Sequence, residues 1–287
     1  MLKYVLYRTF FIFIYNKNEI FRKIGGNVMN DETLQNEVDY LFEKYNNIVY
    51  DPDKFTIFLD DDKFLFGVLS PENDESHLSK EMQYKTLYDT LIDLDAKIKF
   101  SFDNALKCSY QRNLIDNFSI HKRGTSEETL AYYYVENALF RTSSLWDILA
   151  QLYCLFYNIK IPKNYIYYNK LFDTSNEPYY KRYSINEIDN FEEVKEKFDS
   201  IHNYIVEADN WQKSGEWEGN HDYVNKFRNK MIHRNSPNVP TMSDFDFNMK
   251  DEPRFMLKRI IEDYNRVSIY LKEIIDRVYE QHFSKFK

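Results

Sequence analysis

The chain has 287 residues, of which 43% are hydrophobic and 18% aromatic, and this composition excludes an intrinsically disordered chain. Only six glycines and seven prolines are present, which argues against a sandwich or barrel built from many short strands. The formal net charge of −8 argues against broad binding along a nucleic-acid backbone, but it leaves room for a small basic site. We therefore expect a mainly α-helical domain.

The first 28 residues differ from the rest of the chain. The apolar stretch Tyr4–Tyr15 has about 12 residues, whereas a membrane-spanning helix needs about 20. The codons of Gly25 and Gly26 can form a bacterial ribosome-binding sequence just before Met29. We therefore hypothesise that translation starts at Met29, that residues 1–28 are a mis-annotated leader, and that 29–287 form a single helical domain. N-terminal mass spectrometry of the native protein tests this hypothesis.

The cysteines carry no sign of a structural role. Cys108 and Cys154 lie far apart and form no Cys-x-x-Cys motif, so neither a disulfide framework nor a zinc site is indicated. We expect a protein of the reducing cytoplasm with no membrane span.

The N-terminal third contains one clear helix. Asp31–Tyr45 has apolar residues at helical spacing behind a polar start. Two short apolar runs, 55–59 and 64–68, flank Asp60-Asp61-Asp62-Lys63, and this pattern leaves a small β-hairpin open. Three adjacent aspartates cannot converge on a metal ion like ligands at alternate loop positions, so a solvated turn is the better interpretation.

Residues 75–117 have a helical pattern that suggests two helices meeting near Phe100-Ser101. Gly124, preceded by Lys122 and Arg123, has the composition of a helix end, because cations favour the negative end of the helix dipole.

The clearest helix runs from Ser126 to about Tyr157. Its core side is apolar and includes Leu145 and Trp146. The opposite side is polar, and it is either solvated or part of a polar cleft or subunit contact. It carries Glu136, Asn137, Arg141, Ser143, Ser144, Asp147 and Gln151.

The second half of the chain alternates irregular and helical segments. Residues 158–184 look irregular apart from a helical turn around 165–172, and a helix is expected from Ile185 to about Ala208. After a loop at 215–220, Asn220 caps a short helix over 222–235, which Pro237 and Pro240 close. A long helix then runs from Pro253 to about Phe283.

The short helix over 222–235 holds the candidate motif. Arg228 and His233 are separated by four residues, but Arg277 and His282 have the same spacing, so spacing alone means little. Context separates the two pairs: polar Asn229 follows Arg228, whereas the apolar stripe residue Val278 follows Arg277. On a helical wheel His233 lies roughly opposite the buried stripe of its helix, and basic residues surround it within an acidic protein.

The stretch from Phe227 to Arg234 resembles the signature of the HEPN superfamily. In that signature an Arg followed by a polar residue precedes a His by four to six positions on a late helix of an α-bundle. The segment Glu136–Asp147 resembles the earlier helix of bacterial stand-alone HEPN proteins. The resemblance covers about residues 129–283. It implies a HEPN-like antiparallel helical bundle, here with extra N-terminal elements.

The resemblance implies a metal-independent endoribonuclease without a cofactor that acts as a homodimer. His233 would move protons at the ribose 2′-hydroxyl or the leaving 5′-oxygen. Arg228 would bind the phosphate, and Asn229 would orient either group. A second copy would supply the second histidine that acid–base catalysis needs. Basic residues that could contact the RNA are Lys226, Lys230, Arg234 and Arg141.

Two other interpretations stay open at this point. The first is a binding or dimerisation module, because some HEPN domains have no nuclease activity. The second is a purely structural helical protein in which Arg228 only pairs with a neighbouring acidic residue. The sequence identifies neither an RNA target nor an inhibitory protein partner, and it does not decide between a toxin–antitoxin and a phage-defence role.

Overall fold

The computed structural model describes residues 32–55, 77–211, 217–233, 236–243 and 246–284. The predicted hairpin at 55–68 lies outside these residues except for Phe55, and so do the first 31 residues. The described part is mainly helical, which confirms the predicted fold class at that level.

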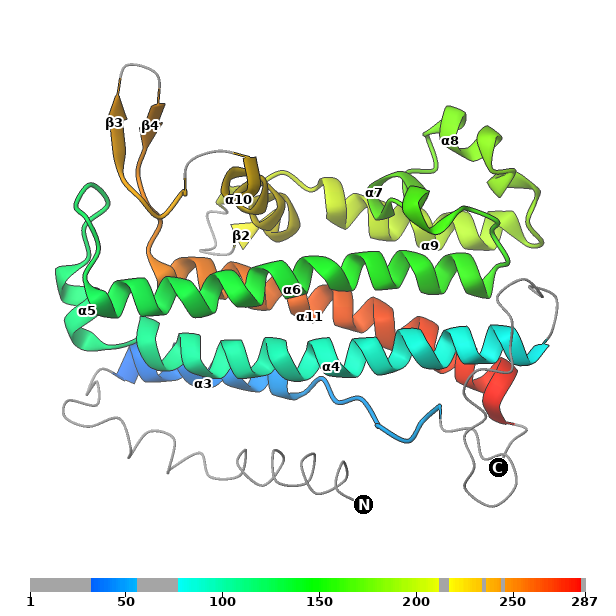
Figure 1. The fold of residues 1–287 in the computed structure, drawn as a ribbon, viewed down its shortest axis with the longest axis horizontal. Helices are drawn as coiled ribbons and strands as arrows, with labels where there is room; N and C mark the ends of the chain where they lie inside the picture. Colours follow the sequence, from blue (N-terminus) through cyan, green and yellow to red (C-terminus); the bar gives the residue numbers. More distant parts are fainter. Residues whose placement is uncertain (1–31, 56–76, 212–216, 234–235, 244–245, 285–287) are drawn as a thin grey trace.

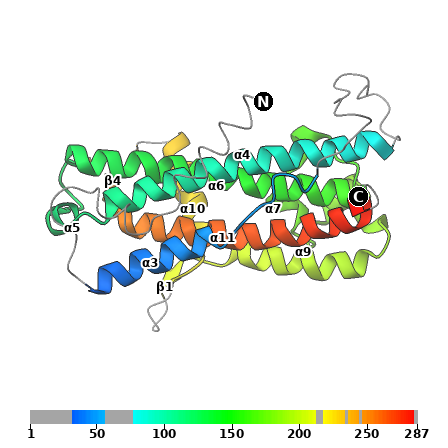
Figure 2. The same ribbon diagram turned by 90° about the horizontal axis from the view of Figure 1, so that it is seen from below.

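Five long helices form the bundle: α3 (Glu32–Asn46), α4 (His77–Ser109), α6 (Ser126–Phe156), α9 (Phe191–Val206) and α11 (Pro253–Val278). Helices α4 and α9 run opposite to α3, α6 and α11 (Figure 1). Seen from below, α11 runs along the length of the molecule, with α3 beside its first half and α9 beside its second half (Figure 2). The arrangement is therefore an antiparallel helical bundle.

Helix α4 is one continuous helix, so the predicted break near Phe100-Ser101 is wrong. Ile98, Phe102 and Ala105 continue its buried stripe without interruption, and all three are fully buried. The Ser101 hydroxyl donates to the Lys97 carbonyl at 2.8 Å, which satisfies this polar group within the helix. The chain turns later, at 110–111, before the short helix α5 (Arg112–Asn117). Helix α5 therefore ends before Gly124, which lies in the loop before α6.

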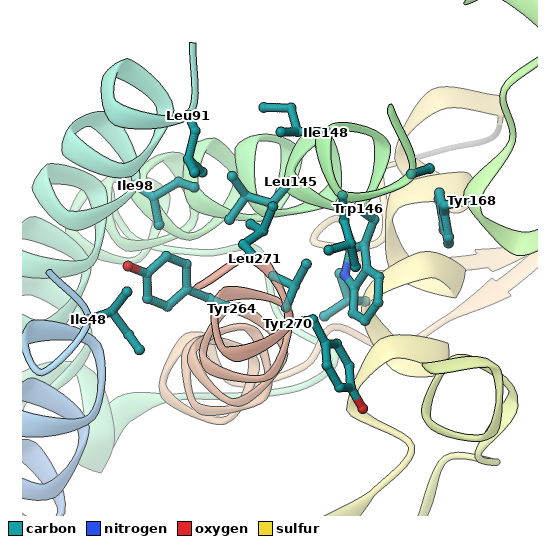
Figure 3. Close-up of a cluster of buried hydrophobic side chains, with 14 of the residues drawn as sticks. Ile48, Leu91, Ile98, Leu145, Trp146, Ile148, Tyr168, Tyr264, Tyr270 and Leu271 are labelled. Carbon is teal, nitrogen blue, oxygen red and sulfur yellow. The ribbon is translucent and has the colours of Figure 1, made fainter. Parts of the chain in front are cut away.

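The core lies where α6 and α11 pack against α4. Apolar side chains of the three helices interlock there, among them Leu91, Leu145 and Leu271 (Figure 3). The core side predicted for α6 is the buried one, and Trp146 is fully buried. The N-terminus of α6 is capped by Thr125, whose hydroxyl accepts a hydrogen bond of 3.3 Å from the backbone N–H of Glu128.

Short elements fill the segment between α6 and α9. They are a 3₁₀ turn at Lys163–Tyr165, α7 (Tyr168–Leu171), α8 (Glu177–Arg182) and a 3₁₀ turn at Ile185–Glu187. The predicted helix from Ile185 to Ala208 begins instead at Phe191, because Asn190 adopts a left-handed backbone with φ of 57°. In Figure 1 this segment lies over the α9 side of α6.

The C-terminal part contains the helix of the candidate motif. The strands β1 (Asn210–Trp211) and β2 (Trp217–Glu218) precede α10 (Asn220–His233). An antiparallel hairpin that the sequence pattern did not indicate, β3 (Thr241–Ser243) and β4 (Asp246–Asn248), joins α10 to α11. A π-helical turn, Tyr279–Phe283, continues α11 to the predicted end.

A buried ion pair ties the entrance of α11 to the start of α6. Lys250 and Glu128 pair with side-chain exposures of only 1% and 6%. The Lys250 backbone N–H also donates to the Ile120 carbonyl at 3.2 Å, and the Tyr132 hydroxyl donates to the Asp251 carbonyl at 2.6 Å. These contacts hold the connection between the β3–β4 hairpin and α11 against the rest of the bundle.

Candidate functional site

The start of α10 depends on a glycine. Gly219 has φ of +65°, and a Cβ there would lie 2.3 Å from the backbone of Ala208. Its N–H donates to Glu207 at 3.0 Å, and its carbonyl accepts the Tyr223 N–H at 3.0 Å in the first turn of the helix. Only a residue without a side chain fits this close approach.

Arg259 of α11 holds the same turn from the core side. Its guanidinium donates to the carboxylate of Asp209 at 2.8 Å and to the carbonyls of Glu218 and Gly219 at 3.0 and 3.1 Å. Aromatic rings surround its charge: those of Trp217, Tyr223 and Phe255 lie 4.9, 4.8 and 5.8 Å away. Because Arg259 is only 1% exposed, it acts as a rigid anchor for α10.

Helix α10 packs its inner side against the bundle and presents the other side to solvent. His221, Tyr223, Val224 and Phe227 are buried. In Figure 1 the helix lies across α6, on the side away from α4. The polar side of α6 is therefore covered in part by α10, and it is not wholly a solvated face.

Arg228 lies at the edge of this buried side. Its side chain is half-buried, and its Nε is buried with no hydrogen-bond partner. Within the described part of the chain its guanidinium forms no hydrogen bond or ion pair. A partly buried guanidinium left in this way has its donors available for an anion.

Two ionisable groups respond to the charge of Arg228. Loss of solvation raises the pKa of Asp147 on α6, and the positive charge of Arg228 lowers that pKa in part. Burial raises the pKa of Tyr168 on α7 to about 12, and Arg228 again acts in the opposite direction. The charge of Arg228 on α10 thus acts on one group of α6 and one group of α7.

The other predicted site residues are less closely associated with Arg228. Lys226 is exposed and pairs with Asp222 at 2.7 Å on its own helix. Arg141 donates to the carbonyl and side-chain oxygens of Asn137 on α6, both at 2.9 Å. Asn229 and Lys230 are exposed. Arg234 and the side chain of His233 lie outside the described residues, so their predicted roles stay predictions.

The spacing of the motif has a geometric consequence. Five residues correspond to 500° of an α-helix, so the backbone positions of Arg228 and His233 lie about 140° apart around α10. Seven residues correspond to 700°, so the histidine that shares the face of Arg228, within about 20°, is His221. This signal was present in the sequence as a His seven positions before the Arg.

His221 belongs to a buried polar network. Its Nδ1 lies 3.2 Å from Oδ1 of Asp263 on α11, and its Nε2 lies 3.1 Å from the hydroxyl of Tyr168. Asp263 also accepts hydrogen bonds of 3.2 Å from Nε1 of Trp146 and from the hydroxyl of Tyr204. Figure 3 shows Trp146 and Tyr168 converging from α6 and α7. The network joins five helices around one fully buried carboxylate.

No cluster of three or more His, Cys, Asp or Glu side chains that would suit a metal ion occurs in the part of the chain that the structure describes. Among the same residues, no helix is both long and apolar enough to cross a bilayer.

Comparison with known proteins gave no relative: no family model, curated protein or solved structure matches this chain.

Proposed function

We propose that the protein is a metal-independent endoribonuclease of the HEPN type, with Arg228 and His233 as its catalytic residues. The observation that carries the proposal is the guanidinium of Arg228, half-buried against α6 with its Nε unpartnered. A buried donor without a partner carries a free-energy cost that an RNA phosphate would remove. The competing interpretation, a structural Arg228 paired with an acidic neighbour, lacks support because Asp147 forms no ion pair with it among the described contacts.

In the proposed reaction the 2′-hydroxyl of the RNA attacks the adjacent phosphorus. His233 takes the proton of that hydroxyl, and Arg228 stabilises the charge that grows on the phosphate oxygens. The products would be a 2′,3′-cyclic phosphate and a free 5′-hydroxyl. The reaction therefore requires RNA and does not proceed on DNA. Asn229 and Lys230, both exposed beside Arg228 on α10, are proposed to contact the RNA, together with Lys226, Arg234 and Arg141.

A homodimer is part of the proposal. The solvent side of α6 presents the large apolar side chains Leu130, Tyr133 and Phe140, and exposed Ile232 lies near the end of α10. Burying such side chains against a second copy would stabilise a dimer and bring two α10 helices close together. The same apolar side chains favour the alternative function, a non-catalytic HEPN binding or dimerisation module. Sedimentation velocity on the wild-type protein tests the dimer separately from catalysis.

The decisive experiment is an RNA cleavage assay in EDTA. Wild-type protein is compared with Arg228→Ala and His233→Ala, and product ends are mapped for the cyclic phosphate. The matched control is Arg277→Ala, which removes the same charge from the pair with the same spacing; Arg277 already has Glu193 and Tyr157 as partners, both at 2.9 Å. We expect activity in the wild type and the control alone. Equal cleavage by all four proteins, or by none, would overturn the nuclease proposal.

A further inference from the structure

The chain between α6 and α9 carries a charge opposite in sign to that of the whole protein. Residues 158–184 contain five basic and two acidic residues, in a chain whose formal net charge is −8. All five cations are exposed: Lys160, Lys163, Lys170, Lys181 and Arg182. Within the described part of the chain none of the five forms an ion pair, whereas exposed Arg112 and Arg277 each pair with a carboxylate at 2.9 Å. The positive charge of this segment therefore remains available to an anionic partner.

Two exposed tyrosines lie among these cations. Most tyrosines of the described residues are buried or half-buried, but Tyr165 and Tyr167 are 47% and 42% exposed. The Lys170 ammonium lies 4.8 Å from the ring centre of Tyr167. The Arg182 guanidinium lies over two rings, 5.6 Å from the centre of Tyr165 and 5.4 Å from that of Tyr183. We call these five residues the tyrosine patch.

The backbone under the tyrosine patch is fixed by buried side chains. The Tyr179 hydroxyl donates to the carbonyl of Tyr165 at 2.8 Å, and its ring lies 5.0 Å from that of Tyr183. The Tyr180 hydroxyl donates to the Leu171 carbonyl at 2.5 Å at the end of α7. A preformed surface loses less conformational entropy on binding than a loose loop does.

A direct contact joins the tyrosine patch to the helix of Arg228. Helices α7 and α10 both pack on α6, on the side away from α4 (Figure 1). Tyr168, next to Tyr167 in the chain, has its hydroxyl 3.1 Å from Nε2 of His221 on α10. Arg228 follows His221 by seven residues, about 10 Å along the axis of that helix. The patch and Arg228 are therefore separated by one side-chain contact and about two helical turns.

The chemistry of the tyrosine patch matches unpaired RNA. Bases that are not stacked in a duplex stack on aromatic rings and guanidinium planes, while cations bind the phosphates. Every nucleotide of a single strand offers one base and one phosphate, and the patch offers rings and cations side by side. A duplex hides the faces of its bases, so it gains from the cations but not from the rings.

We propose that the tyrosine patch binds single-stranded RNA and delivers it to Arg228, so that cleavage falls on unpaired RNA. The delivery rests on the proposed function, whereas the binding of the strand does not. Bases stack on Tyr165 and Tyr167, and Lys170 and Arg182 bind the flanking phosphates. Because every base has a face that can stack, the patch selects unpaired RNA without selecting a sequence.

Fluorescence anisotropy with a short, uncleavable 2′-deoxy oligonucleotide tests the binding in the full-length protein. The double variant Tyr165→Leu/Tyr167→Leu should bind the single strand about tenfold or more weakly than the wild type, because each stacked base contributes to affinity. Its affinity for the same strand annealed to a complement should stay within about twofold of the wild type, since a duplex does not use the rings. Both tyrosines are exposed, so the substitutions leave the core intact.

The matched control is Tyr40→Leu on α3. Tyr40 is 49% exposed and has the Lys44 ammonium 5.0 Å from its ring centre, as in the patch, but Glu262 pairs with that lysine. This variant should bind the single strand like the wild type.

The cations give a second readout. Lys170→Gln/Arg182→Gln should reduce the slope of log affinity against log salt by about 1.4, since each phosphate contact on a single strand contributes about 0.7. Arg112→Gln, which removes an exposed cation already paired with Asp116, should leave the slope unchanged.

The outcomes separate this inference from the proposed nuclease function. If the wild type binds single strands through the tyrosine patch but cleaves no RNA, the binding is supported and the nuclease proposal fails. If cleavage depends on His233 but Tyr165→Leu/Tyr167→Leu binds like Tyr40→Leu, only the inference fails. Equal losses of affinity for single strand and duplex would also overturn it. So would a wild type that binds no single strand at low salt, which is the result expected if the patch contacts a protein instead.

Discussion

Asp147 on α6 and Arg228 on α10 act on each other through their charges, yet they form no ion pair among the described contacts. The donors of the guanidinium therefore stay available to an anion, but the negative charge of Asp147 opposes the binding of that anion. The charges of the two residues therefore couple α6 to α10 although no ion pair joins the two side chains.

The first prediction concerns this competition. Asp147→Asn should tighten binding of an uncleavable 2′-deoxy oligonucleotide roughly three- to tenfold, since the interaction of one exposed charge with another is worth about 1 kcal/mol. Glu196→Gln, an equal charge change at an exposed position on α9, is the control. Fluorescence anisotropy at low salt measures both, and equal affinities for the two variants would contradict the prediction.

The same variant has a defined pH dependence. The pKa of Asp147 is raised, so it becomes protonated at a higher pH than an ordinary carboxyl. Protonation removes the opposing charge, and the affinity advantage of Asp147→Asn should shrink as pH falls through that raised pKa. A constant advantage from pH 7 down to about 3, which is below the ordinary Asp pKa of about 3.9, would exclude Asp147 as its cause.

The second prediction concerns Gly219. Gly219→Ala should lower the free energy of unfolding by about 2 kcal/mol or more, because the backbone is left-handed there and the new methyl would meet the backbone of Ala208. Asn203→Ala, at an exposed position on α9, should change this free energy by less than about 0.5 kcal/mol. Urea unfolding followed by circular dichroism compares the two variants. Equal losses would show that the close approach at Gly219 is not decisive.

The third prediction concerns the buried ion pair of Lys250 and Glu128. Lys250→Met should destabilise the protein by about 3–5 kcal/mol, because it leaves the Glu128 carboxylate buried without its partner. Adding Glu128→Leu to this variant should restore at least half of that loss. A double-mutant cycle in urea measures the coupling, and strictly additive effects would mean that the two side chains do not depend on each other.

The fourth prediction concerns Arg259. Arg259→Lys should lower the free energy of unfolding by about 1–3 kcal/mol, because an ammonium group is more strongly hydrated and cannot lie against the rings of Trp217, Tyr223 and Phe255 as the planar guanidinium does. Arg266→Lys on the exposed side of the same helix should have little effect. Thermal unfolding compares them. A loss at Arg266 as large as that at Arg259 would refute the anchoring role.

The sequence predicted the structure best where a helix buries one continuous stripe of apolar residues. The limits of α6 and α11 followed from apolar residues repeating every three or four positions. The predicted break in α4 was wrong because Ser101 can satisfy its hydroxyl on its own helix, a contact that composition does not reveal. The β3–β4 hairpin was missed because each of its strands has only three residues.

The candidate site was predictable only in part. Arg228 stood out by its polar and basic context, and the structure leaves its Nε without a partner. Tyr168, His221 and Asp263 could not be grouped from the sequence, because their contacts join residues that are 42 and 53 positions apart. With 25 tyrosines in the chain, no local pattern marks Tyr168 as different from the rest. Tertiary packing alone brings this group together.

The short, irregular elements between α6 and α9 have a consequence for variation among related chains. The long helices can exchange one apolar residue for another of similar volume and still close the bundle. The segment that carries α7 has less freedom, because it must deliver one hydroxyl to one imidazole in a neighbouring helix. We therefore expect that substitutions can accumulate in most of the bundle with little loss of structure, whereas a shift of one residue in this segment would leave a folded chain without the hydrogen bond between Tyr168 and His221.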